Sequence, residues 1–239
     1  VSGAGKVTLG GPTINSGSTY NTSGETHLRG GVTRFNTSAT TGSLTTVTGG
    51  QNTLEVNGAS TTLTVNGSYT QSGGTTKLIS GSTIDAGSFN FQGGFLTGIG
   101  TLDGSLTSTN TTISPGSSPG TLTVNGSTIL GSGDTLFMEL GGLAQGSQYD
   151  FFHVIGSLTL GGLLSLDVIN GFDSSIQIGD IFTIATASSP ITGAFSNVAS
   201  GGLLSALSFP GYEFSVNYGA GSAYGAENVT LVAVNLAPE

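Results

Sequence analysis

Short runs in which apolar and small polar residues alternate make up most of the chain between Val7 and Gly133. Thr61-Thr-Leu-Thr-Val-Asn-Gly67 and Ser88-Phe-Asn-Phe-Gln-Gly-Gly94 are two such runs, and each ends in a turn rich in Gly, Asn or Ser. Strict alternation is the pattern of a strand that buries one face, and glycine at this density disfavours a helix. The pattern therefore predicts an all-β chain built from short strands.

Comparable apolar positions recur about once every 20 residues, a period typical of repeat architectures. Leu44, Leu63, Ile84, Leu102 and Leu122 form one such series. A repeat of this length, made of short strands and turns, is expected for one coil of a parallel β-helix, whose coils stack about 4.8 Å apart. A β-sandwich of hairpins needs turn signals roughly every 8–12 residues, and those are present too. The longer repeat favours the solenoid over the sandwich.

A hexapeptide, Leu-Thr-Val-Asn-Gly-Ser, occurs at 63–68 and again at 122–127, and Leu54-Glu-Val-Asn-Gly58 is a weaker copy. A doubled Ser-Pro-Gly turn at 114–120 precedes the second copy. Because internal repeats can decide a fold before single residues are weighed, these copies support the solenoid. The Ser-Pro-Gly doublet marks the place where the texture of the chain begins to change.

After Gly133 the strands become longer and more apolar. The last two, at 212–218 and 228–234, are joined by a glycine-rich loop. We therefore predict a parallel β-helix with regular coils over 1–130 and a wider C-terminal section over 131–239, continuous with the first and ending in a hairpin cap. About twelve coils would give a rod about 60 Å long.

Composition narrows the classes of function. The 239 residues include no cysteine, which excludes disulfides, thiolate metal sites and cysteine nucleophiles. No window reaches about 18 uninterrupted apolar residues, so we expect no membrane-spanning helix. All four basic residues, Lys6, Arg29, Arg34 and Lys77, lie in the first 77 positions, whereas 78–239 carry eleven acids and no Lys or Arg. An acidic body argues against a nucleic-acid partner, which needs cations for its phosphates.

The uneven charge predicts head-to-tail self-association. A basic N-terminal part and an acidic, aromatic C-terminal part are complementary, and a head-to-tail contact that does not close on itself produces a fibre. The alternative interpretation is a solvated acidic surface, with aromatic side chains that pack inside the cap. The residues expected at such a subunit contact are Lys6, Arg29, Arg34, Tyr212, Phe214, Tyr218 and Tyr224.

Asp85 and Asp103 are weak candidates for a catalytic or metal site. Their separation in the sequence is close to one coil, so their carboxylates are expected to stack about 5 Å from each other. That distance suits a retaining glycosidase or a calcium site, and the alternative is a pair of solvated turn aspartates. No basic residue follows Lys77 to act as a lyase base, and no Ser-His-Asp order or phosphate-binding loop is present. We therefore expect no catalytic residues, no metal and no cofactor.

The second half of the chain contains a series of distinctive runs: the Ser-Pro-Gly pair with Thr121-Leu-Thr-Val124, Tyr149-Asp-Phe-Phe-His-Val-Ile-Gly156, Leu158-Thr-Leu-Gly-Gly-Leu-Leu-Ser-Leu166, Gly179-Asp-Ile-Phe-Thr-Ile184 and Ile191-Thr-Gly-Ala-Phe195. Through these runs the segment from Ser114 to Val234 resembles the C-terminal part of autotransporter-type passenger β-helices and of PEP-CTERM-associated surface proteins. The resemblance covers the second half of the chain well and the first half only in texture. It implies export and a surface or matrix role, and it implies no catalytic residues. The final Leu236-Ala-Pro-Glu239 resembles the beginning of a Pro-Glu-Pro sorting signal.

Together these observations predict a secreted or cell-surface structural or adhesive β-solenoid that associates with itself, with surface glycans as a further partner. Two alternatives stay open: a polysaccharide lyase or glycoside hydrolase, and a passive stalk that presents another domain. Because the chain begins at Val1 rather than Met, we expect it to be cut from a longer precursor. The sequence thus specifies a shape more closely than a chemistry.

Overall fold

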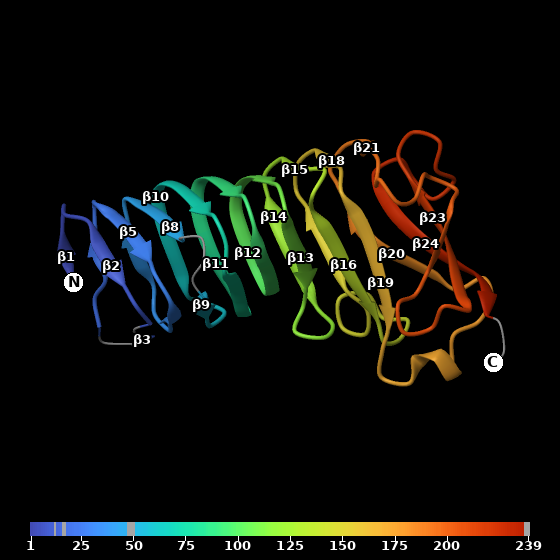
Figure 1. Cartoon of the computed structure of the whole chain (residues 1–239), viewed down its shortest axis with the longest axis horizontal. Helices are drawn as coiled ribbons and strands as arrows, with labels where there is room; N and C mark the ends of the chain where they lie inside the picture. Colours follow the sequence, from blue (N-terminus) through green and yellow to red (C-terminus); the bar gives the residue numbers. More distant parts are fainter. Residues whose placement is uncertain (12, 16–17, 47–50, 237–239) are drawn as a thin grey trace.

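The chain folds into one elongated parallel β-helix with its two termini at opposite ends (Figure 1). A computed structural model describes residues 1–11, 13–15, 18–46 and 51–236. Within them the only helical segment is the short η1 (Phe172–Ser174), and no helix is long and apolar enough to cross a membrane. The prediction of an all-β parallel solenoid is confirmed.

Strands of successive coils stack into three parallel ladders, and each regular coil contributes one segment to each ladder in turn. Ladder 1 consists of β1 (Ser2–Gly3), β4 (Asn21–Thr22), β7 (Ala39–Thr41), the first part of β10 (Thr62–Gln71), the middle of β11 (Thr75–Phe91) and of β12 (Gly94–Ser108), β14 (Thr121–Asn125), β17 (Phe151–Val154) and β20 (Ile181–Thr186). Ladder 2 consists of β2 (Val7–Leu9), β5 (Glu25–Leu28), β8 (Ser43–Thr46), the last parts of β10, β11 and β12, β15 (Thr128–Leu130), β18 (Leu158–Leu160) and β21 (Thr192–Gly193). Ladder 3 consists of β3 (Thr13–Ile14), β6 (Gly31–Phe35), β9 (Asn52–Asn57), the first parts of β11 and β12, β13 (Thr111–Pro115), β16 (Thr135–Leu140) and β19 (Leu163–Val168).

The register of ladder 1 shows where the coils widen. A regular coil has about 21 residues. The two C-terminal coils, from Thr123 to its partner His153 and from His153 to its partner Thr186, each contain about half as many residues again as a regular coil. The predicted short repeat and the wider C-terminal coils are therefore confirmed. The expectation of about twelve coils is wrong, because the wide coils and the terminal cap take up the remaining residues. The partners that follow one another through the regular coils are Ser2, Asn21, Thr40, Thr64, Asp85, Asp103 and Asn125.

Inward-pointing side chains of successive coils stack into a narrow core. In ladder 2 the stack of Leu44, Tyr69, Phe89 and Leu106 is fully buried, and each residue is the direct partner of the next. The ring centroids of Tyr69 and Phe89 lie 6.2 Å apart in an edge-to-face arrangement, which aromatic pairs prefer. The outward positions of the strands carry mostly threonine, serine and asparagine, as the alternating pattern predicts.

Polar side chains inside this core are paired with one another. Tyr69 Oη lies 2.5 Å from Thr76 Oγ1, and Thr76 donates to Gln71 Oε1 at 2.6 Å. Gln71 Nε2 in turn donates to the carbonyl of Gly93 at 2.8 Å. Because Thr76 donates to Gln71, Tyr69 is the donor to Thr76, and burial raises the pKa of the Tyr69 hydroxyl. A connected network of this kind avoids the cost of an unpaired buried polar group.

A glycine turns the chain at the corner between ladders 1 and 2. In the repeated hexapeptide the Leu and Val are buried, and Gly67 or Gly126 stands at this corner. A Cβ atom on Gly126 would lie 2.5 Å from the backbone of Gly104, the corner glycine of the preceding coil. Only glycine lets the two coils approach so closely, which explains why the hexapeptide recurs. The corner glycines that are followed by serine are Gly42, Gly67, Gly87, Gly104, Gly126 and Gly156.

An antiparallel sheet closes the C-terminal end of the solenoid. β24 (Asn228–Leu236) pairs with β20 on one side and with β23 (Tyr212–Tyr218) on the other, and β22 (Leu203–Ser205) pairs with β23. Phe214 and Leu231 on its inner face are fully buried. The predicted hairpin of the last two strands and its role as a cap are confirmed.

Main-chain groups at the edge of the last coil are also covered. Asn197 Oδ1 accepts a hydrogen bond from Leu164 N at 3.0 Å, and Asn197 Nδ2 donates to the carbonyl of Leu164 at 2.8 Å. One side-chain amide therefore takes the place of a neighbouring strand. Leu207 N adds a bond of 2.9 Å to the carbonyl of Leu166. Unpaired strand edges invite further pairing, so these contacts end ladder 3 at β19.

Candidate functional site

Asp85 and Asp103 lie side by side on the outward side of ladder 1. They are direct partners in adjacent coils, with Thr64 before them and Asn125 after them in the same row. Both carboxylates are partly exposed, and Asn125 Nδ2 donates to Asp103 Oδ1 at 2.8 Å. The structure thus brings the two predicted residues together.

The surroundings of this pair are those of a solvated polar row. No group of three or more His, Cys, Asp or Glu side chains in the described part of the chain is placed to hold a metal ion. The direct partners on either side, Thr64 and Asn125, are uncharged. Both aspartates stand on the flat outer side of a ladder and line no part of the groove described below. This arrangement presents hydrogen-bonding groups on the outer side of ladder 1.

Two of the cations expected at a subunit contact are paired within the chain. Lys6 Nζ lies 3.6 Å from Glu25 Oε2, and Arg34 Nη2 lies 2.5 Å from Glu55 Oε2. Stacking places residues one coil apart in the sequence next to each other, so opposite charges in adjacent coils meet. Arg29 is exposed and takes part in none of the ion pairs found among the described residues. Lys6 and Arg34 both keep exposed side chains within these pairs, so their role at a subunit contact stays a prediction.

Glu25 is the centre of a small polar cluster on ladder 2. It contacts His27 Nε2, accepts a hydrogen bond of 3.0 Å from Thr45 Oγ1 and faces Lys6. The hydrogen bond from His27 is the largest cause that lowers the pKa of the Glu25 carboxyl, and Thr45 and Lys6 act in the same direction. The cluster ties the first coils together.

Most of the aromatic residues expected at the same contact pack inside the cap. Phe214 and Tyr218 are buried, and Tyr218 Oη donates to the carbonyl of Val198 at 2.8 Å. Tyr212 is half-buried and its hydroxyl donates to the carbonyl of Asp173 at 2.8 Å. Of the four, only Tyr224, in the loop between β23 and β24, is exposed. The expectation is therefore corrected for Phe214 and Tyr218, whose rings form the core of the antiparallel cap, and it stays a prediction for Tyr212 and Tyr224.

Two buried aspartates near the Ser-Pro-Gly doublet have structural roles that sequence reading missed. Asp134 accepts hydrogen bonds from Ser108 Oγ at 2.5 Å and from two backbone amides at 2.8 Å. Asp150 accepts from Gly120 N at 2.9 Å and from Glu139 N at 3.0 Å. Their sequence signal is weak, because an aspartate just before a strand is ordinarily a solvated turn residue.

Burial raises the pKa of Asp150 to about 7. The two amide hydrogen bonds oppose that rise, and the nearby charge of Glu139 adds to it. Since its oxygens bind the loop ahead of β14 and the main chain of β16, Asp150 joins the last regular coil to the first wide one.

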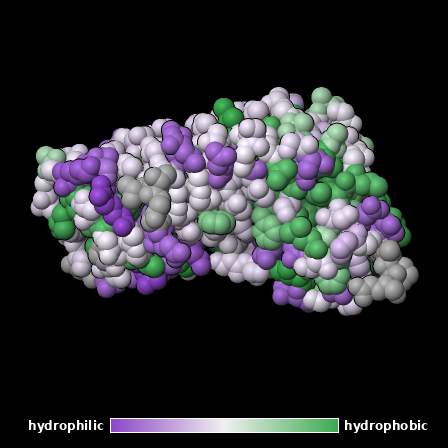
Figure 2. Space-filling model, in the orientation of Figure 1, coloured by the Kyte–Doolittle hydropathy of each residue, from purple (hydrophilic) through white to green (hydrophobic). Residues whose placement is uncertain are grey.

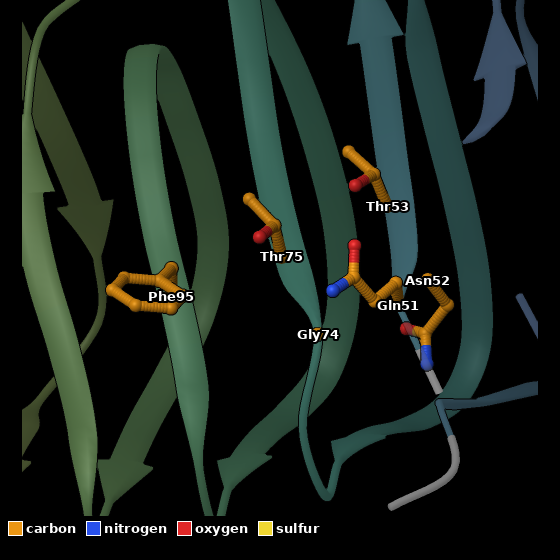
Figure 3. Close-up of a pocket in the computed structure, with 6 residues that line it drawn as sticks. All are labelled: Gln51, Asn52, Thr53, Gly74, Thr75 and Phe95. Atoms are coloured by element: carbon orange, nitrogen blue, oxygen red, sulfur yellow. The ribbon is translucent and has the colours of Figure 1, made fainter. Parts of the chain in front are cut away.

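A shallow groove of about 330 Å³ opens on ladder 3 beside β9, β11 and β12 (Figure 3). Thr53, Thr75 and Phe95 are direct partners in successive coils, and their side chains form a row along the groove. The Phe95 ring is 51% exposed. Gln51, Asn52 and Gly74 complete the lining, so the groove contains no charged side chain.

Sequence reading also missed Phe95. The alternation in β12 places it on the side opposite the buried Leu96, and that outward aromatic position was the available signal. No protein-family model matches the chain, and neither does any curated protein. Any functional assignment therefore rests on the geometry of these surfaces, and the resemblance to exported β-helices stays a prediction.

Proposed function

We propose that the chain is the rod-like part of an extracellular structural protein and serves as a stalk or as an element of a surface layer or matrix. The observation that carries this proposal is one continuous solenoid, whose coils are joined through three ladders of main-chain hydrogen bonds. A solenoid of this kind grows in one dimension and holds its two ends apart. That is the task of a spacer.

The surface of the rod supports an exported setting. Charged residues make up 7% of the chain, against about 25% in an ordinary globular domain. The polar surface of the rod therefore consists mainly of hydroxyl and amide groups. One row of exposed or partly exposed serines follows the corner glycines from Ser43 to Ser157. A surface of hydroxyl groups stays hydrated when pH or salt changes, and a chain without cysteine does not depend on the redox state.

The proposal includes no catalytic activity. Asp85 and Asp103 form the pair that a glycan-cleaving β-helix would use, and their place on a flat outer side gives a substrate nothing to enter. Polysaccharides incubated with the chain are expected to be recovered intact. Cleavage that is lost in Asp85→Asn would support the enzymatic alternative instead.

Head-to-tail self-association is the second part of the proposal. Because the edge of ladder 3 is covered at this end, we place the contact on side chains of the terminal sheet. A row of residues crosses the outer side of the terminal sheet from Leu203 through Ser215 and Val232 to Ile181, each paired with the next. Leu203 and Ile181 are 55% and 51% exposed, and Figure 2 shows apolar surface gathered in this part of the molecule. Exposed apolar patches of this kind mark interaction surfaces.

Negative-stain imaging and sedimentation velocity of the purified chain test both parts. We expect elongated particles that join end to end through this apolar row. Ile181→Ser is expected to shorten the assemblies. The matched control is Ile129→Ser, because Ile129 is 48% exposed but lies on ladder 2, away from the terminal sheet; it is expected to leave the assemblies unchanged. Compact particles would contradict the rod. Monomers at low salt and high concentration would contradict the self-association alone.

A further inference from the structure

We propose that the groove beside β9, β11 and β12 binds a short segment of a neutral polysaccharide, with a sugar ring stacked on Phe95. This binding function goes beyond the structural role and does not depend on it. It gives the rod a specific contact with glycans along one side, away from both ends (Figure 1).

Phe95 provides the apolar part of the site. Its direct partners in the adjacent coils are Thr75 and Thr112, and neither side chain is large enough to cover the ring. The face of an aromatic ring carries partial negative charge. A pyranose presents C–H groups on one of its faces and hydroxyl groups around its rim, so its C–H face fits an exposed aromatic ring.

The polar part of the site lies across the opening from Phe95. Gln51, just before β9, carries an exposed amide group, and Thr53 and Thr75 carry hydroxyl groups (Figure 3), whereas the Asn52 side chain is buried. Amides and hydroxyls both donate and accept hydrogen bonds, as sugar hydroxyl groups do. The lining therefore combines one aromatic face with groups of dual hydrogen-bonding character, the general composition of a small-ligand site.

Gly74 keeps the floor of the groove open. Its φ is +80°, which glycine adopts without strain. A Cβ atom at this position would lie 2.4 Å from the carbonyl oxygen of Asn52, so no side chain fits there. Gly74 therefore lines the groove through its backbone, next to Thr75 (Figure 3).

Charge selects a neutral glycan over an acidic one. The nearest charged side chains on ladder 3 are Arg34, Glu55 and Lys77, which are successive direct partners and alternate in sign. Because Arg34 is paired with Glu55, Lys77 is the single remaining cation of this row, and one cation gives little attraction for a chain of uronic acids. The net charge of −9 further repels polyanions.

The dimensions suit a short oligosaccharide segment that lies along the rod. Thr53, Thr75 and Phe95 belong to three successive coils, so their row is about 10 Å long. The same row continues beyond Phe95 to Thr112 and Thr135, which offers hydroxyl groups to the rest of a longer chain. A volume of about 330 Å³ lies at the small end of the range of ligand sites.

Titration calorimetry with cellohexaose, xylohexaose, laminarihexaose and hexagalacturonate tests the site. We expect the native chain to bind at least one of the three neutral hexasaccharides with a Kd of about 0.1–1 mM. Phe95→Ala is expected to weaken that binding at least tenfold, and Phe95→Tyr to retain it because the ring is kept. Ile129→Ala removes an equally exposed apolar side chain outside the groove and is expected to change nothing.

Three results would overturn the proposal: no binding of any neutral hexasaccharide, equal affinity in native chain and Phe95→Ala, or binding of hexagalacturonate alone. Circular dichroism and the melting temperature are expected to be the same in all four proteins, because Phe95 and Ile129 are half-exposed. The shape seen in the microscope is independent of these results, so failure of the glycan site leaves the rod intact.

Discussion

At the scale of the residue, the buried carboxyl of Asp150 links the stability of the fold to pH. Its ordinary pKa of 3.8 is raised to about 7 in the folded chain, chiefly by burial. Between these values the folded chain keeps a proton that the unfolded chain has released. Stability contributed by this group is therefore present at low pH and is lost as the pH rises toward 7.

We expect the free energy of unfolding to fall by about 3 kcal/mol between pH 5 and pH 8 through this group. Asp150→Asn is expected to remove this dependence, and it lowers stability at pH 5 because an amide nitrogen then faces a backbone N–H. Asp85→Asn, on the outer side of ladder 1, is the control that keeps the dependence. Urea unfolding at the two pH values measures it, and an Asp150→Asn profile that parallels the native one would contradict the assignment.

A second prediction concerns the glycine corner. Gly126→Ala places a methyl group 2.5 Å from the backbone of Gly104, so the two coils have to separate locally. Such overpacking is expected to cost about 1–3 kcal/mol in the free energy of unfolding. Gly10→Ala is the matched control, because a Cβ atom there meets nothing within 4 Å. Thermal unfolding compares the two, and equal effects would show that the corner tolerates a side chain.

At the scale of the element, the end of ladder 3 depends on one side chain. Asn197→Ala removes both hydrogen bonds to Leu164 and leaves its amide and carbonyl at an edge. We expect a loss of about 1–3 kcal/mol in stability and faster hydrogen exchange at Leu164 N. Asn125→Ala, which removes an exposed side-chain bond to Asp103, is expected to be nearly neutral. Unchanged protection of Leu164 would show that other residues cover this edge.

Much of the element order was predictable because inward and outward positions alternate. The pattern located the strands, the length of the repeat and the closing hairpin, since each depends on burial. The number of coils was not predictable, because loops of the wide coils and the cap have no apolar repeat. The role of the corner glycines was not predicted either, although it explains why the hexapeptide recurs. Their requirement comes from the approach of two backbones, which a sequence does not display.

The candidate sites were predictable only where the repeat decides them. The spacing of Asp85 and Asp103 placed them in adjacent coils, and the structure puts them in register. The pairing of Lys6 and Arg34 with glutamates follows from the same stacking but needs the register of each coil. The burial of Phe214 was not predictable, since the face of the cap sheet that packs on the core depends on how the sheet folds over the last coil.

At the scale of the whole molecule, the two ends of the rod differ. The C-terminal end is closed by an antiparallel sheet, whereas the inward side chains of the first coil, Val7, Leu9 and Ile14, are only partly buried. All of the Lys and Arg lie in the N-terminal part of the molecule, and most of the exposed large apolar residues lie in the remainder. A rod with unlike ends has a direction, so assemblies built from it are polar.

The stacking of the coils also gives the rod a folded length much shorter than the length of its extended chain. About 21 residues occupy one rise of about 4.8 Å in the solenoid, and the same residues drawn out reach about 70 Å. A load between the two termini acts along the axis, where the main-chain hydrogen bonds point, and each coil is held mainly by its neighbours. Coils therefore detach one after another, and each releases more than ten times its folded rise. We therefore expect force–extension curves of the rod to show stepwise lengthening rather than a single break.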